Sequence, residues 1–221
     1  MLIEPESYLY TYAITRDFGF APNPFHGVCT LATCKPRIRK AAKVGDWVLG
    51  VGGGGLKSVS RKCIFLMKVS EKMCFQEYWE DSRFSLKKPS RNGSQVQMLG
   101  DNIYHKDDGC EWVQEDSHHS NSDGTINSVN LTRDTGRCDQ VLISDHYFYF
   151  GGGAVSVDLN SIGYKRIRDF KKTNLSESKG GIKLIESISK EYGASKNMII
   201  EDPYQFIDSH KRVDQITGKI T

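Results

Sequence analysis

The stretch from Tyr8 to Gly55 constrains the fold more than any other part of the chain. It begins with Tyr8–Ile14 (YLYTYAI), where aromatic and small residues alternate as in a half-buried strand. It closes with Val44–Val51 (VGDWVLGV), a Gly-Asp turn followed by a second apolar strand. The intervening residues 16–43 form an excursion that is too long for a plain loop in a compact domain. We therefore expect this excursion to be ordered or functional.

The excursion contains a rigid loop and a basic run. Pro22 and Pro24 are two residues apart, which excludes a helix interior or a central strand. Cys34–Ala42 (CKPRIRKAA) is compatible with one or two helical turns, with Pro36 near the start. A basic run of this kind is either a solvated helical face or a contact for phosphate groups. The phosphate-binding candidates are Lys35, Arg37, Arg39 and Lys40.

The rest of the chain alternates between apolar strand-like runs and one polar region. Lys62–Val69, Gln140–Ser144 and Ala154–Leu159 are typical of strands. Asp107–Asn130 is polar with little periodicity, which predicts a long surface insertion. Ile182–Tyr192 has apolar residues at helical spacing and is followed by Gly193, a plausible helix stop.

Strands thus dominate up to residue 160 and helix follows, which predicts an α+β fold. We expect a curved mixed sheet or a small β-barrel, with peripheral helices and a polar insertion at about 105–135. Residues 1–221 are expected to form a single domain, with a core at 8–160 and a C-terminal helical extension at 161–221.

Composition places the chain among soluble globular proteins, with 38% hydrophobic and 26% charged residues. The net charge of +3 is compatible with a polyanionic partner but does not demand one. No apolar run approaches the length of a membrane span, and the first residues lack a secretion signal pattern. The six cysteines contain no CxxC pair and suit reduced thiols. We therefore expect a cytoplasmic protein.

The order of these segments resembles the PUA-like superfamily, which includes EVE, ASCH and YTH domains. In that superfamily a K-x-G-D-x-hydrophobic turn opens a barrel strand, and a nucleobase binds in a neighbouring pocket. Here the corresponding turn is KVGDWV, at residues 43–48. The resemblance implies a PUA-like core with a pocket beside this turn.

A closer resemblance joins the chain to a bacterial and phage family, the second group of nucleotide modification associated domains. The similar segments are YA at 12–13, DFGFAPNP at 17–24, CTLATCKP at 29–36, GDWV at 45–48, DNIYH at 101–105 and SDHYFYFG at 144–151. The resemblance implies a link to nucleic-acid base modification or phage defence. Nucleic acid or a nucleotide is then the expected partner, beside partner proteins of a modification or defence system.

Two sets of residues are candidates for a site on a base. Aromatic rings can stack on an extruded base, and amide or hydroxyl groups can read its edges, although both kinds of residue also serve as core or turn formers. The base-binding candidates are Phe18, Asn23, Phe25, Cys29, Thr30, Trp47, Asn102, Tyr104 and Tyr149. DNIYH and SDHYFYFG each combine an acid with a histidine, as acid–base chemistry requires. The acid–base candidates are Asp17, His105, Asp145 and His146.

Cysteine chemistry and cofactors receive less support. Cys29 follows His26 by three residues and is a candidate nucleophile, and Cys34 precedes the positive charge of Lys35. An inert buried thiol is the commoner role of a cysteine. Histidines 118 and 119 lie in the polar region and are most simply surface or hydrogen-bonded residues. Neither a zinc motif nor a nucleotide-cofactor glycine motif is present, so we expect no metal and no cofactor.

Three hypotheses follow for the function. The first is a binding module that holds a nucleotide or modified base in a polar-aromatic pocket with a basic rim. The second is an enzyme that acts on a base or nucleotide by Asp/His acid–base chemistry. The third is an interaction subunit with no ligand of its own.

Overall fold

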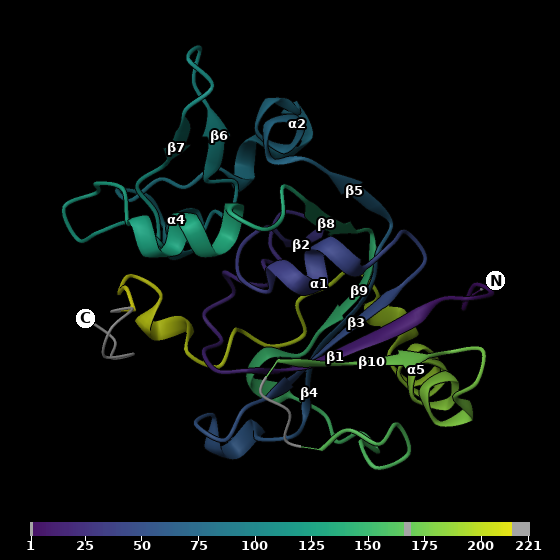
Figure 1. Cartoon of the computed structure of the whole chain (residues 1–221). Coiled ribbons are helices and arrows are strands. Elements are labelled where there is room, and N and C mark those ends of the chain that lie inside the picture. The colour runs from purple at the N-terminus through teal and green to yellow at the C-terminus, as the bar shows by residue number, and fades with distance from the viewer. Residues whose placement is uncertain (1, 166–168, 214–221) are drawn as a thin grey trace.

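A five-stranded mixed sheet runs through the middle of the fold (Figure 1). The computed structural model describes residues 2–165 and 169–213. In order across the sheet, the strands are β10 (Phe170–Asn174), β1 (Tyr8–Ile14), β3 (Trp47–Gly52), β4 (Cys63–Lys68) and β9 (His146–Tyr149). β1 and β3 pair in parallel with Leu9 opposite Trp47, and the other pairs are antiparallel. Parallel neighbours need a long crossover, and the predicted excursion supplies it.

Two smaller sheets accompany the central one. β2 (Cys29–Leu31), β8 (Val141–Ser144) and β5 (Glu71–Met73) pair in the order β2-β8-β5. β6 (Tyr104–Lys106) and β7 (Trp112–Gln114) form a hairpin. In the described residues no sheet closes into a barrel. The predicted α+β fold with a mixed sheet is therefore confirmed, and the barrel alternative is not formed.

Short helices surround the sheets. The α-helices are α1 (Pro36–Ala41), α2 (Phe75–Glu80), α3 (Gln95–Met98), α4 (Ser128–Thr135) and α5 (Lys179–Glu191). The 3₁₀ turns are Lys57–Val59, Ser82–Lys87, Gly151–Gly153, Gly193–Ser195 and Phe206–Asp208. The predicted helices at Cys34–Ala42 and Ile182–Tyr192 correspond to α1 and α5. None of the helices in the described ranges is long and apolar enough to cross a bilayer.

The two faces of the central sheet bury different partners because side chains alternate along each strand. Leu9 of β1 packs into a core with Leu184, Ile185 and Ile188 of α5. Tyr10 and Tyr12 point the other way, into a core with residues of β2 and α1. A third core lies beyond them, around Phe18, Phe20, Phe75 and Tyr104. Tyr12 therefore lies on the face of the sheet that the excursion covers.

Two local predictions were wrong. Residues 154–159 form no strand, and only Val155 makes an isolated bridge, with Cys63. The region predicted as a surface insertion has an exposed tip, but residues 117–120 are buried. Polar residues can be buried when their groups find partners, and here Asn130 Nδ2 donates to the His119 carbonyl over 2.7 Å.

Candidate active site

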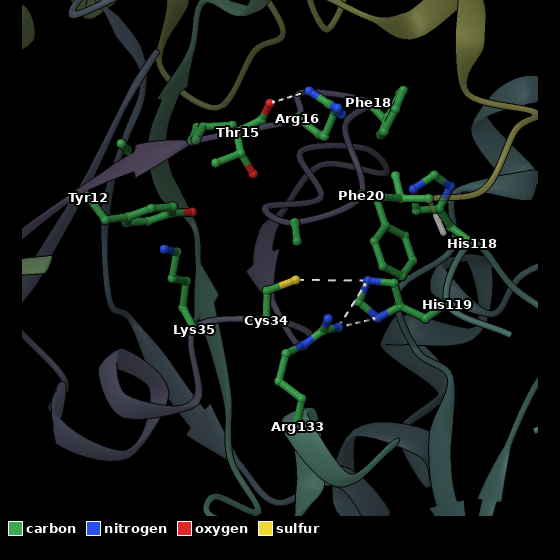
Figure 2. A pocket seen from close by; sticks show the side chains of 14 residues that line it. Tyr12, Thr15, Arg16, Phe18, Phe20, Cys34, Lys35, His118, His119 and Arg133 are labelled. Carbon is green, nitrogen blue, oxygen red and sulfur yellow. Dashed lines mark hydrogen bonds between the residues drawn. The ribbon is translucent and has the colours of Figure 1, made fainter. Parts of the chain in front are cut away.

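A cavity of about 180 Å³ opens between β1, the loop that precedes α1 and the end of α4 (Figure 2). Its floor is Cys34, with Tyr12 and Lys35 on one side and His119 and Arg133 on the other. The complete lining is Tyr12, Ala13, Ile14, Thr15, Arg16, Phe18, Phe20, Ala21, Cys34, Lys35, His118, His119, Arg133 and Val213. Segments far apart in the sequence thus converge on one cysteine.

Cys34 lies in a left-handed turn between β2 and α1. Its φ is 58° and that of Lys35 is 41°, a backbone region that costs energy for residues other than glycine. Pro36 then begins α1 with a φ already suited to a helix. Such strained positions persist only where the surroundings hold them and are common at functional sites.

Arg39 supplies much of this support. Its side chain is 0% exposed, and Nε donates to the Cys34 carbonyl over 2.8 Å. The other guanidinium nitrogens donate to the carbonyls of Gln140 over 2.6 Å and Asp134 over 2.5 Å. Arg39 therefore ties the cysteine turn to the end of α4 and to the start of β8.

His119 joins Cys34 to a buried carboxylate. Its Nε2 lies 3.8 Å from Cys34 Sγ, and its Nδ1–H donates to Asp134 Oδ2 over 2.9 Å. The imidazole also packs edge-on against Phe20, with ring centroids 4.6 Å apart. The Asn130 contact to the His119 carbonyl fixes the backbone of the same residue. The ring orientation is thus set from three directions.

Asp134 is 0% exposed and accepts several hydrogen bonds. Its Oδ1 accepts from the Cys34 backbone N–H over 2.9 Å, so the same carboxylate positions both the cysteine and the histidine. Its Oδ2 also accepts from the Tyr104 hydroxyl over 3.0 Å. Arg133 Nε donates to Oδ1 over 2.9 Å. Because several hydrogen-bond donors surround it, the Asp134 carboxylate is stabilised in its ionised form.

The electrostatics of the three residues favour a charged cysteine and histidine. Burial raises the pKa of the Cys34 thiol, but the charges of Arg133 and His119 outweigh it and leave the pKa below its usual value. Burial lowers the pKa of His119, but Cys34 and Asp134 raise it further, to a net increase. Burial raises the pKa of Asp134, but His119 and Arg133 bring it well below normal. These directions favour a thiolate–imidazolium pair beside a carboxylate.

This arrangement meets the geometric requirements for covalent catalysis. A nucleophile lies within hydrogen-bonding reach of a base, and a third group orients the base. Sulfur–nitrogen contacts in proteins without substrate are commonly long and shorten in the reacting complex. No cluster of three or more metal-ligating side chains is found within residues 2–165 and 169–213.

The four predicted acid–base residues are not brought together. The buried Asp17 accepts from the hydroxyl of Tyr149 and from the backbone N–H of Tyr204. His105 contacts Glu115 over 2.9 Å in the β6–β7 hairpin. Asp145 pairs with Ser70 in a turn, and His146 packs edge-on against Trp47. Among the described residues no hydrogen bond joins any two of these four side chains.

The predicted base-binding residues are distributed between the cavity and the core. Phe18 lines the cavity, and Tyr104 positions Asp134. The other seven lie elsewhere and are buried: Asn23, Phe25, Cys29, Thr30, Trp47, Asn102 and Tyr149. Burial raises the pKa of the Cys29 thiol to about 12, which leaves it protonated and unreactive near neutral pH.

Asn23 and Thr30 belong to a buried polar network centred on Lys87. Lys87 Nζ donates to Asn23 Oδ1 over 2.8 Å and to Thr30 Oγ1 over 3.2 Å. The Thr30 hydroxyl in turn donates to Asp101 over 2.6 Å. Burial lowers the pKa of Lys87 to about 8. The network braces β2, the strand that leads to Cys34.

The four predicted phosphate-binding residues differ in exposure. Lys35 lines the cavity. Arg37 pairs with Asp169 over 2.7 Å at the surface, and Lys40 is exposed. Arg39 is buried, and three carbonyl groups accept from its guanidinium, so we assign it to the support of the cysteine turn. A phosphate role for the other three stays a prediction.

Sequence reasoning missed the main residues of this site. The sequence patterns favour Cys29 over Cys34 as a nucleophile, predict a surface or hydrogen-bonded position for His119 and do not single out Asp134. The available signal was the cysteine at the start of a short basic helix, where positive charge favours a thiolate. The histidine and aspartate lie 85 and 100 residues further along the chain. Their approach to Cys34 depends on the fold.

Comparison with known families identifies the chain. Residues 6–210 match the family described as nucleotide modification associated domain 2, so the chain belongs to that family. The resemblance inferred from the sequence motifs is therefore confirmed, and the match extends past residue 160. No curated protein and no solved structure matches the chain. The likeness to PUA-like domains stays a prediction.

Proposed function

We propose that this protein is a thiol enzyme of nucleotide modification that catalyses acyl transfer or acyl hydrolysis. The Cys34–His119–Asp134 arrangement in a cavity supports this proposal more than any other observation. In this arrangement Cys34 is the nucleophile and His119 is the general acid and base. Asp134 orients His119 and favours its protonated form. The family description supplies the link to nucleotides.

The proposed reaction has two steps. Cys34 Sγ attacks the carbonyl carbon of an amide, ester or thioester, and the leaving group departs with a proton from the His119 imidazolium. The thioester on Cys34 then reacts with water, or with an amino or hydroxyl group of the acceptor. His119 takes the proton of that attacking group, and the Cys34 thiolate leaves. The first step consumes the charge pair, leaving a neutral thioester and a neutral imidazole, and the second step restores it.

A binding module without chemistry is the second candidate. Phe18 and Phe20 contribute rings to the cavity wall, which suits a flat group such as a base. Such a module would use the same cavity but would form no bond to Cys34. Covalent modification therefore distinguishes the two candidates.

A chemical probe tests the proposed function. We expect p-nitrophenyl acetate to acetylate the protein once, at Cys34, with an adduct that hydroxylamine removes as it removes thioesters. The Cys34→Ala variant should lose this adduct completely, because the other described thiols lack the His119–Asp134 pair. Intact-protein and peptide mass spectrometry measure the modification.

The matched control for this experiment is Cys110→Ala, which removes an exposed cysteine far along the sequence from Cys34. This variant should acetylate like the parent protein. An unmodified parent, or an equal adduct on Cys34→Ala, would show that Cys34 is not an activated nucleophile.

A further inference from the structure

The wall of the cavity opposite His119 has a polar group without a partner. Tyr12 is 2% exposed, and its hydroxyl makes no hydrogen bond within the described residues. Figure 2 shows this hydroxyl directed from β1 toward the space above Cys34. Leaving a buried hydroxyl unpaired costs about 1–3 kcal/mol, so such groups generally have a role. Burial raises the pKa of Tyr12 well above its usual value, so the hydroxyl remains a donor.

Lys35 adds a positive charge to the same wall. Its Nζ lies 4.7 Å from the centroid of the Tyr12 ring, and the described residues give it no ion pair or hydrogen bond. Burial lowers the pKa of this ammonium group, and the neighbouring Cys34 opposes that effect. An ammonium group removed from water in this way is stabilised by an anion close to it.

The formally charged side chains of the cavity lining are positive. Arg16, Lys35 and Arg133 line the cavity, and none of its described lining residues is an aspartate or glutamate. Behind the floor, Asp134 offsets the charges of His119 and Arg133, which leaves Lys35 as the positive charge beside the Tyr12 hydroxyl. A cavity with this balance concentrates anions.

The size of the cavity limits what enters it. A closed cavity of roughly 150 Å³ holds a ligand of the size of benzene. The space within the present cavity, at about 180 Å³, suits a short acyl group with one charged substituent. The remainder of a larger substrate would lie outside the mouth.

We propose that the group that reacts with Cys34 carries an anionic substituent, a carboxylate or a phosphoryl group, held by Lys35 Nζ and the Tyr12 hydroxyl. This inference rests on the proposed function, because it defines the substrate class of the same cysteine. The anion binds on the wall opposite His119, and the electrophilic carbon lies between the two walls, above Cys34 Sγ.

Iodoacetate and iodoacetamide test this directly, because they are nearly equal in size and differ in charge. We expect the ratio of their rate constants, iodoacetate over iodoacetamide, to be at least about 10-fold higher at Cys34 than for N-acetylcysteine amide in the same buffer. The Lys35→Met variant should reduce the Cys34 ratio by at least about 5-fold. Tyr12→Phe should reduce it in part. Lys43→Met, directly after the same basic run and outside the cavity lining, should leave it unchanged.

Competition identifies the anion. Slower carboxymethylation of Cys34 in the presence of acetate assigns a carboxylate substrate, and slower carboxymethylation with inorganic phosphate assigns a phosphoryl group. Protection by neither, or an equal ratio in the parent and Lys35→Met proteins, overturns the inference. If iodoacetamide also fails to react with Cys34, the proposed function itself is wrong. The failures of the two proposals are therefore distinguishable.

Discussion

Replacing Asp134 with asparagine is expected to slow the reaction of Cys34 with iodoacetamide at pH 7 by about 10- to 100-fold, because thiolate content controls the rate. The carboxylate raises the pKa of His119, and the resulting imidazolium lowers the pKa of Cys34 by more than the direct charge of Asp134 raises it. Asparagine keeps the shape of the side chain but removes its charge. His119 then loses its proton at a lower pH, and Cys34 keeps its proton to a higher one.

The pH dependence of the alkylation rate tests the same coupling between Asp134, His119 and Cys34. In the parent protein the lowered pKa of Cys34 moves the rise in alkylation rate to a lower pH than that of an ordinary thiol. In Asp134→Asn the rise in rate with pH should shift to higher pH. Rates measured by peptide mass spectrometry at several pH values give both curves.

Two further variants distinguish the loss of the Asp134 charge from a general effect on folding. Asp116→Asn changes a partly exposed aspartate that pairs with Arg212, and it should react like the parent protein. Tyr104→Phe removes one hydrogen bond to Asp134 and should slow the reaction by only about 3- to 10-fold, which corresponds to roughly 1 kcal/mol. A folded Asp134→Asn protein with the rate and pH profile of the parent would contradict the assigned role.

The second large effect concerns stability. Lys87→Met is expected to lower the free energy of unfolding by about 3–5 kcal/mol, the usual cost of removing one charge from a buried polar pair. Lys87 is 1% exposed, and its ammonium group also donates to the carbonyls of Asn23 and Val28, each over 2.9 Å. Methionine fills similar space but leaves these acceptors and Asp101 without their donor or counter-charge.

Urea denaturation measures this effect, with Lys57→Met as the control. Lys57 is exposed in a 3₁₀ turn, and its replacement should change the unfolding free energy by less than about 0.5 kcal/mol. A Lys87→Met protein within about 1 kcal/mol of the parent would show that the network does not brace β2.

Local patterns predicted much of the fold. The alternation in Tyr8–Ile14 and the apolar run at 62–69 correspond to β1 and β4, and the helical spacing at 182–192 corresponds to α5. These elements have one face that must leave water, and that requirement is visible as a periodicity. The strand predicted at 154–159 does not form, because an apolar segment becomes a strand only where the edge of a sheet is available to pair with it.

The candidate site was less predictable because its main residues are polar and buried. His119 and Asp134 come from a segment without periodicity, and their burial depends on partners such as Tyr104 and Asn130. In contrast, Asp17, Asn102 and Trp47 are candidate site residues in the sequence because they lie in motifs rich in aromatic and polar residues. The structure places all three outside the cavity lining, where they pack or hydrogen-bond within the core, although Asp17 lies between the lining residues Arg16 and Phe18. A motif identified the family but did not locate the nucleophile.

The most direct test of the central claim is the rate of iodoacetamide alkylation at Cys34 as a function of pH, with Cys110 as the internal reference. We predict that Cys34 reacts faster than Cys110 at pH 6 and that its alkylation rate begins to rise at a lower pH, although Cys110 is the more exposed thiol. Equal profiles at the two cysteines, or no reaction at Cys34 across the pH range, would contradict the assignment of Cys34 as an activated nucleophile.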